Sequence, residues 1–278
     1  MSAFAADVVQ RPLALPAPAP EARAWRDLAF LFAALFAVTL PVYALDERLL
    51  NGVSAWAKPL KFQASLALHF ATLALVARLL PAWRRRSPLF RGTVTVSTAA
   101  GLFEIGWIML QAARGRASHF NDATALEAGM YALMGIGALL LVAAPFLLSL
   151  FMLRDHGARV WREPLLLGVT LGLAVSAVAT LVVAGYMSTS GSHWVGEVAS
   201  DAGGLPLVGW SRQGGDLRVA HFFARHALQV LPLAGLALRG GGRRGVRRLV
   251  TLSVLYLLVT GALFAQALAG LPLIGLPG

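Results

Sequence analysis

Three ionisable side chains recur at a similar depth in three separate apolar runs of the sequence. At ~1.5 Å per helical residue, His69 lies about 13 Å from the start of its run, Glu104 about 15 Å from Arg114, and His226 about 12 Å from Arg218. Ionisable groups inside a membrane are costly, so they usually pair or serve a site. Two histidines and a carboxylate suit Zn or Fe with open coordination positions. The spacing predicts a metal site of His69, His226 and Glu104, with Glu104 and His226 as the candidate catalytic residues.

A b-type haem is the alternative cofactor for the same layer. His69 and His226, on different helices, would be its axial ligands, and nearby cations would meet its propionates. The candidate propionate partners are Lys61, Arg114 and Arg116, with Lys58 close by. Either cofactor would make the chain a membrane oxidoreductase or a metal-dependent enzyme acting on a membrane-soluble or periplasmic small molecule.

A second interpretation of the same residues requires no cofactor. The stretch RVAHFFARHALQ places five polar side chains on a helical arc about 140° wide: Arg218, His221, Arg225, His226 and Gln229. Arg225 and Arg218 would hold an anionic or lipid-like ligand while Glu104 carries a proton. The chain would then be a transporter or a sensor, and both interpretations remain open from the sequence.

Two polar loops are expected to cover this site from the outer side. Their candidate ligand or lid residues, with Gln111 at the end of the preceding run, are His119, Asn121, His193, Trp194 and Trp210. The longer loop also carries Glu197, Asp201 and Arg212 among many glycines. Long loops in compact domains often carry function.

The composition is that of a multi-pass membrane protein. Hydrophobic residues make up 58% of the 278 positions, charged residues make up 13%, and the net charge is +11. The arginines sit in short runs between apolar segments, so the positive charge indicates membrane orientation and no nucleic-acid partner. The absence of cysteine excludes disulfides, thiolate metal sites and Cys-held iron–sulfur clusters.

The apolar runs predict an all-α fold, a bundle of seven transmembrane helices preceded by a disordered, Ala/Pro-rich cytosolic tail over residues 1 to 26. The membrane domain covers 27 to 278, with helices near 27 to 45, 60 to 80, 92 to 113, 130 to 152, 164 to 186, 217 to 238 and 249 to 270. With the N-terminus cytoplasmic, 16 Lys and Arg residues lie on the inner side and 8 on the outer side. This bias predicts a C-terminus outside, in a bacterial inner membrane.

A small-residue stripe marks the fifth of these helices. Gly168, Gly172 and Ser176 recur at four-residue spacing, which lets a second helix approach closely. The stripe is expected to pack within the bundle, and a homo-oligomer contact is the alternative. The other expected partners are the lipid bilayer and a small-molecule or lipid-like ligand.

Three segments resemble recurring elements of uncharacterised bacterial polytopic membrane proteins. They are WAKPLKF, QAARGRASHFN and GDLRVAHFFARHALQVLP, and they cover the second, third and sixth helices. The loop and helix GLPLVGWSRQGGDLRVAHFFARHA resemble the layout of haem A synthase over one hairpin. Neither resemblance implies a role for a particular residue.

Overall fold

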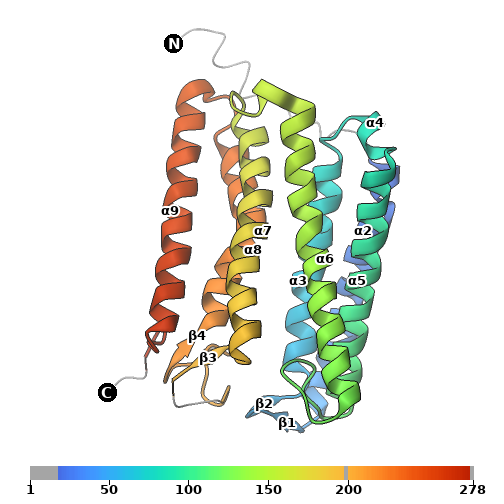
Figure 1. Ribbon diagram of the computed structural model, residues 1–278, viewed down its shortest axis with the longest axis vertical. Coiled ribbons are helices and arrows are strands. Elements are labelled where there is room, and N and C mark those ends of the chain that lie inside the picture. The colour runs from blue at the N-terminus through green and yellow to red at the C-terminus, as the bar shows by residue number, and fades with distance from the viewer. Residues whose placement is uncertain (1–17, 197–199, 276–278) are drawn as a thin grey trace.

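Antiparallel helices make up most of the chain. The computed structural model describes residues 18–196 and 200–275. In this part, each long helix runs opposite to the one before it (Figure 1). The long helices are α2 (Arg23–Leu45), α3 (Ala57–Ala77), α5 (Pro88–Ala113), α6 (Ala125–His156), α7 (Pro164–Ser190), α8 (Leu217–Ala237) and α9 (Gly242–Leu268). Short helical turns lie at one end only: η1 (Pro20–Ala22), α4 (Ala82–Arg85) and η2 (Gly157–Arg159).

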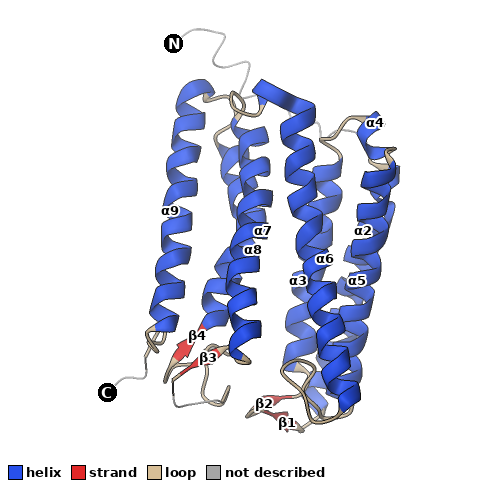
Figure 2. Cartoon of the chain, viewed as in Figure 1, coloured by secondary structure: helices blue, strands red, loops and turns tan. Residues whose placement is uncertain are grey.

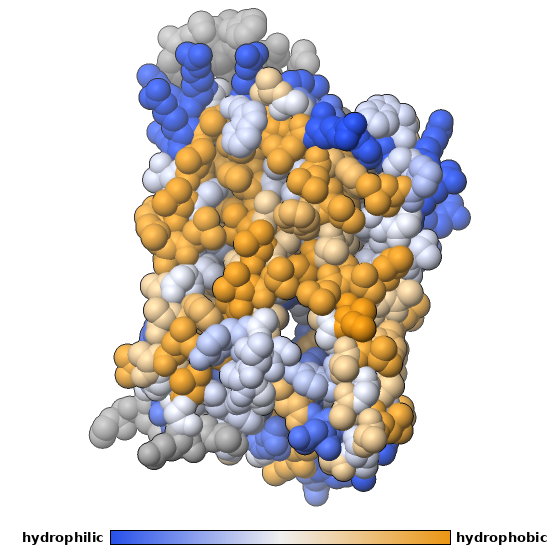
Figure 3. All heavy atoms as spheres, viewed as in Figure 1, coloured by the Kyte–Doolittle hydropathy of each residue, from blue (hydrophilic) through white to orange (hydrophobic). Residues whose placement is uncertain are grey.

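Six helices of the described chain are long and apolar enough to cross a membrane, which confirms an all-α membrane protein. The long helix outside this set is α8, whose 21 residues include two arginines, two histidines and a glutamine. Hydrophobic side chains cover the middle of the face seen in Figure 3, and hydrophilic ones gather at both ends of it. This distribution is expected when hydrocarbon surrounds the middle of a bundle.

Capping residues and prolines set several helix starts earlier than the apolar runs predict. Ser87 caps α5 by accepting a hydrogen bond from the Phe90 amide, and Pro88 occupies the first turn. Thr124 caps α6 in the same way through the Glu127 amide. These helices therefore begin four and five residues before the predicted positions 92 and 130.

The predicted boundary of the disordered tail at residue 26 is wrong. The η1 turn begins at Pro20 and α2 at Arg23. The Trp25 side chain is fully buried, donates a 2.8 Å hydrogen bond to Ser97 Oγ and packs edge-on against Phe90. Burial of this aromatic ring orders the start of α2. Residues 1–17 of the expected tail lie outside the described part.

The small-residue stripe of α7 is covered by α8. A Cβ added to Gly168 would lie 2.5 Å from the Leu231 carbonyl oxygen, and one added to Gly172 would lie 2.6 Å from Pro232 Cδ. Ser176 Oγ donates a 3.0 Å hydrogen bond to the Arg225 carbonyl oxygen. The stripe therefore packs within the bundle and is not free for a second copy of the chain.

Two small sheets lie at the end of the bundle opposite α4, here called the loop end (Figure 2). β1 (Leu49–Leu50) pairs with β2 (Val53–Ser54), and β3 (Trp194–Val195) pairs with β4 (Gly215–Asp216), both antiparallel. The first hairpin turns at Asn51 and Gly52, which both have positive φ, as a tight two-residue turn requires. The Asn51 carbonyl accepts a 3.0 Å hydrogen bond from the Asp201 amide, so this hairpin supports the long loop before α8.

Candidate functional site

Helices α3 and α8 face each other across the bundle, and their polar side chains meet at several levels. Farthest from the loop end, Gln229 Nε2 donates a 2.9 Å hydrogen bond to Thr72 Oγ1. One turn closer, His69 on α3 interacts electrostatically with Arg225 on α8. Polar side chains of α3 and α8 therefore share one region, which we call the α3–α8 cleft.

At the loop end, two cations from opposite sides of the cleft hold one loop. Lys61 Nζ on α3 donates a 3.1 Å hydrogen bond to the Val208 carbonyl, and Arg218 Nη2 on α8 donates a 2.8 Å bond to the Gly209 carbonyl. The loop is a tight turn in which the Leu205 and Trp210 backbones bond to each other at 2.8 Å. Two consecutive carbonyl oxygens are thus tied to α3 and α8, and residues 205–210 bridge the mouth of the cleft.

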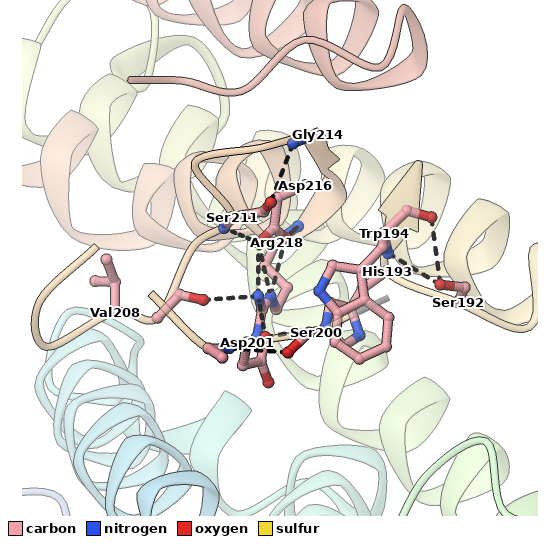
Figure 4. Close-up of polar contacts among 12 residues, drawn as sticks. Ser192, His193, Trp194, Ser200, Asp201, Val208, Ser211, Gly214, Asp216 and Arg218 are labelled. Atoms are coloured by element: carbon pink, nitrogen blue, oxygen red, sulfur yellow. Dashed lines mark hydrogen bonds and ion pairs between the residues drawn. The ribbon is translucent and has the colours of Figure 1, made fainter. Parts of the chain in front are cut away.

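Arg218 is the centre of this loop network (Figure 4). Its guanidinium contacts Asp216 and Asp201, with closest nitrogen–oxygen distances of 2.6 Å to each. Asp216 is fully buried and also accepts hydrogen bonds from the Ser211 and Arg218 amides, so it caps α8. Two carboxylates neutralise Arg218, so its guanidinium is already engaged within the loop network.

His193 and Asp201 extend the network toward the second sheet. His193 Nε2 lies 3.6 Å from Asp201 Oδ1, an ion-pair separation too long for a hydrogen bond, and its ring stacks on Trp194 at 3.9 Å. Burial lowers the pKa of His193 below its ordinary value, despite the neighbouring Asp201 carboxylate. Burial would raise the pKa of Asp201, but His193 and the Arg218 charge outweigh it and hold that pKa below its usual range. At neutral pH, a neutral histidine therefore sits beside an ionised carboxylate.

The loop network should loosen when the pH falls below about 6.5, the ordinary pKa of histidine. The pKa of His193 is lower in the folded than in the unfolded chain. The neutral ring therefore contributes its full stability above about pH 6.5, and this contribution is lost as the pH falls through the pKa of the folded state. The stability contributed by the Asp201 carboxylate also falls as the pH falls, but it is lost only under strongly acidic conditions. We expect roughly three- to tenfold weaker amide-exchange protection of residues 200–216 at pH 5 than at pH 7.5, after correction for intrinsic rates. In the His193→Gln variant this difference should disappear, and equal protection of the native loop at both pH values would contradict the assignment.

Arg225 differs from Arg218 because no counter-charge accompanies it. It lies eight residues into α8, about 12 Å along the helix. Surrounding protein desolvates its guanidinium, yet the side chain remains partly accessible. Within the described residues, no carboxylate or hydrogen-bond acceptor pairs with this guanidinium. Its charge acts on His69, His221 and His226.

Glu104 lies on a third helix, α5, and its side chain packs against α6. A Cβ added to Gly137 would lie 2.5 Å from Glu104 Oε1, so the absence of a side chain at Gly137 makes room for the carboxyl group. This oxygen is buried and has no hydrogen-bond partner among the described residues. The charged group that acts on Glu104 is Lys58, at the start of α3.

The predicted metal ligands have different neighbours. His69 is buried, and neither ring nitrogen has a hydrogen-bond partner in the described chain. The His226 ring packs against Phe222, tilted by 49° with the ring centroids 4.0 Å apart, and Glu104 lies over Gly137. No group of three or more His, Asp or Glu side chains suited to a metal ion occurs in residues 18–196 and 200–275. The structure therefore does not bring His69, His226 and Glu104 together as one ligand set.

The proposed propionate partners are already engaged elsewhere. Arg116 and Arg114 lie 2.8 and 3.9 Å from the buried Glu127 carboxylate, which also accepts a 3.3 Å hydrogen bond from Gln111. Lys61 is tied to the Val208 carbonyl. The expectation missed Glu127, although the spacing of Thr124 and Glu127 is that of a capping box, which signals a helix start and a fixed carboxylate.

The remaining lid candidates hold the loops in place. The His119 ring packs against Phe62 and Tyr131 at 5.7 and 6.0 Å, and Asn121 Nδ2 donates to the Ala117 carbonyl at 2.8 Å. Trp210 packs against Phe222 of α8 at 5.4 Å. Glu197, also expected in the lid, lies outside the described residues. These contacts are made within the loops and with the helix ends beside them.

A gap passes between the two groups of helices near the loop end in the space-filling view (Figure 3). The group of α2, α3, α5 and α6 lies on one side of this gap and the group of α7, α8 and α9 on the other (Figure 1). Cationic groups of the cleft are desolvated but partly accessible, as the side chains around an internal opening are.

Comparisons with known proteins add no assignment to this geometry. No family model matches the chain, and neither the curated proteins nor the solved structures show a significant similarity to it. The class of protein defined by the fold is therefore an all-α, multi-pass membrane protein with a cationic cleft.

Proposed function

We propose that the chain binds an anionic, lipid-like small molecule in the α3–α8 cleft, as a transport or sensing protein of the bacterial inner membrane. The observation that supports this most directly is the unpaired Arg225 guanidinium, which is desolvated and partly accessible. An uncompensated charge at this depth is costly, and a bound carboxylate or phosphate would remove that cost. The ligand would complete the ion pair that the chain leaves open.

The neighbours of Arg225 define what else the ligand meets. His69 faces Arg225 with two unpartnered ring nitrogens, one of which carries a proton and would donate to the anion. Lys58, at the start of α3, interacts electrostatically with Glu104, a buried carboxyl group that can exchange a proton. Glu104 keeps its predicted role as a proton carrier in this proposal.

The proposal includes seven membrane crossings, with α8 as an inner helix. The polar side chains of α8 face the cleft, and its small residues pack on the α7 stripe, so low apolarity does not require α8 to leave the membrane. The arginine bias favours an orientation with the N-terminus in the cytoplasm and the loop end outside. Ligand would then enter from the outer leaflet or from the periplasm.

Binding of oleate to the full chain in nanodiscs tests the proposal, with uncharged oleyl alcohol as the comparison. Trp210 and Trp194 near the mouth provide a fluorescence signal. We expect Arg225→Gln to weaken oleate binding by about ten- to 100-fold, the loss of one charge-assisted interaction, and to leave oleyl alcohol unaffected. Arg91→Gln, an exposed arginine on α5, should behave as wild type.

Two outcomes would contradict the proposal. Equal binding of oleate and oleyl alcohol would show that charge is not recognised, and oleate binding that survives Arg225→Gln would place the anion elsewhere. The cofactor interpretation depends on the unpartnered ring of His69. A Soret band or stoichiometric metal in the purified protein, lost in His69→Ala, would favour that interpretation instead.

A further inference from the structure

A group of exposed arginines surrounds the start of α9, at the end opposite the α3–α8 cleft. Hydrophilic side chains gather over this helix start in the space-filling view (Figure 3). The arginines are Arg239, Arg243, Arg244, Arg247 and Arg248, all exposed. In the described part of the chain none of them has an acidic partner. Cations at a helix N-terminus oppose the helix dipole, so these charges gain no compensation from the helix itself.

Two of these arginines lie on the same face of α9 as a stripe of apolar residues. At about 100° per residue, Arg244, Leu252, Leu255 and Val259 all lie within about 40° of the direction of Arg248. Arg243 and Arg247 lie about 100–140° away from that direction, on another face. Only Arg244 and Arg248 therefore head the stripe.

The stripe forms one wall of an apolar groove between α8 and α9. The groove has a volume of about 280 Å³ and is lined by Val230, Leu231, Ala234, Leu252, Leu255, Tyr256 and Val259. Val230, Leu252, Leu255 and Val259 are exposed large hydrophobic residues, so the groove opens toward the bilayer. On α9 the groove begins at Leu252, about 6 Å along the helix from Arg248, and extends to Val259, about 16 Å from Arg248.

We infer that Arg244, Arg248 and the α8–α9 groove together bind an acidic phospholipid. The phosphate of the headgroup accepts hydrogen bonds from the two guanidinium groups, and an acyl chain fills the groove below them. Charge and apolar surface follow each other in the order found in a lipid molecule, from the interface inward. A zwitterionic lipid would bring its own cation next to the arginines, so an anionic headgroup is favoured. This site is separate from the cleft of the proposed function and does not depend on it.

Native mass spectrometry of the full chain in detergent, titrated with phosphatidylglycerol or phosphatidylcholine, tests this inference. We expect the wild-type chain to retain phosphatidylglycerol selectively. Arg244→Gln with Arg248→Gln should weaken its binding by about tenfold or more, whereas Arg243→Gln with Arg247→Gln should change it less than about twofold. The two double variants remove the same charge from neighbouring positions on different faces of α9.

A second variant tests the groove with all the arginines in place. Leu255→Trp fills part of the space between α8 and α9 and should also weaken phosphatidylglycerol binding several-fold. Equal losses in both arginine pairs would show diffuse attraction and overturn the site, as would unchanged binding in Leu255→Trp. Equal retention of phosphatidylcholine, or displacement of the lipid by inorganic phosphate alone, would also overturn it. Oleate binding should be unchanged in all these variants, which separates this site from the α3–α8 cleft.

Discussion

Replacing Asp216 with alanine is expected to lower the free energy of unfolding by about 3 kcal/mol or more, the usual cost of breaking a buried ion pair. The carboxylate is fully buried and accepts bonds from two backbone amides at 2.9 and 3.0 Å and from the Arg218 side chain. Alanine would remove the α8 cap and leave Arg218 with only Asp201 and one carbonyl oxygen as partners. The helix start and the loop at the mouth of the cleft would lose their common support.

Equilibrium unfolding in mixed micelles, followed by circular dichroism, measures this change. Asp122→Ala is the control, because Asp122 is exposed in the other outer loop and its loss should cost less than about 0.5 kcal/mol. A loss below about 1 kcal/mol in Asp216→Ala would mean that the loop network contributes little to the fold.

Gly172→Leu is expected to be the most damaging change in the helix packing. The first added atom would lie 2.6 Å from Pro232 Cδ and 2.8 Å from the Ala227 carbonyl oxygen, so α7 and α8 could accommodate it only by moving apart. Overpacking of this kind costs about 1–3 kcal/mol and occasionally more, and leucine adds three further carbons to the clash. We expect a large fall in the yield of folded protein and in its unfolding midpoint.

The matched control for this change lies on the same helix. Gly185 is exposed, and nothing lies within 4 Å of an added Cβ, so Gly185→Leu should be tolerated in the lipid-facing surface. Equal yields and midpoints for the two variants would show that close α7–α8 contact is not needed. Because Ser176 also bonds to the Arg225 carbonyl, separation of these helices should weaken oleate binding as well.

The helices could be predicted from the sequence because each apolar run is long enough to cross a bilayer. Their starts were harder to place, since Ser87 and Thr124 set them through hydrogen bonds and not through hydropathy. The helical start of α2 near Trp25 was not predicted, because an Ala/Pro-rich composition does not indicate that one aromatic ring is buried.

The sequence predicted which helices carry the polar residues of the candidate site better than it predicted the contacts between those residues. Helical periodicity identifies which side chains share a face of one helix, and it correctly placed polar groups of α3 and α8 opposite each other. It does not reveal how far each helix is rotated against its neighbours, so Glu104 was expected beside His69 and lies over Gly137. The pairing of Arg218 with Asp201 was beyond reach as well, because Asp201 belongs to a loop with no periodicity.

The hold of Lys61 and Arg218 on the loop has an evolutionary consequence. Both cations bind carbonyl oxygens, which every amino acid provides, so the contact does not depend on the side chains at positions 206–208. The backbone constrains two positions, because Leu207 and Gly209 have φ of +69° and +68°, and a Cβ added to Gly209 would lie 3.4 Å from Lys61 Nζ. In related chains we therefore expect sequence drift at positions 206 and 208, no β-branched residue at position 207, and an invariant glycine and two invariant cations at the base of the loop.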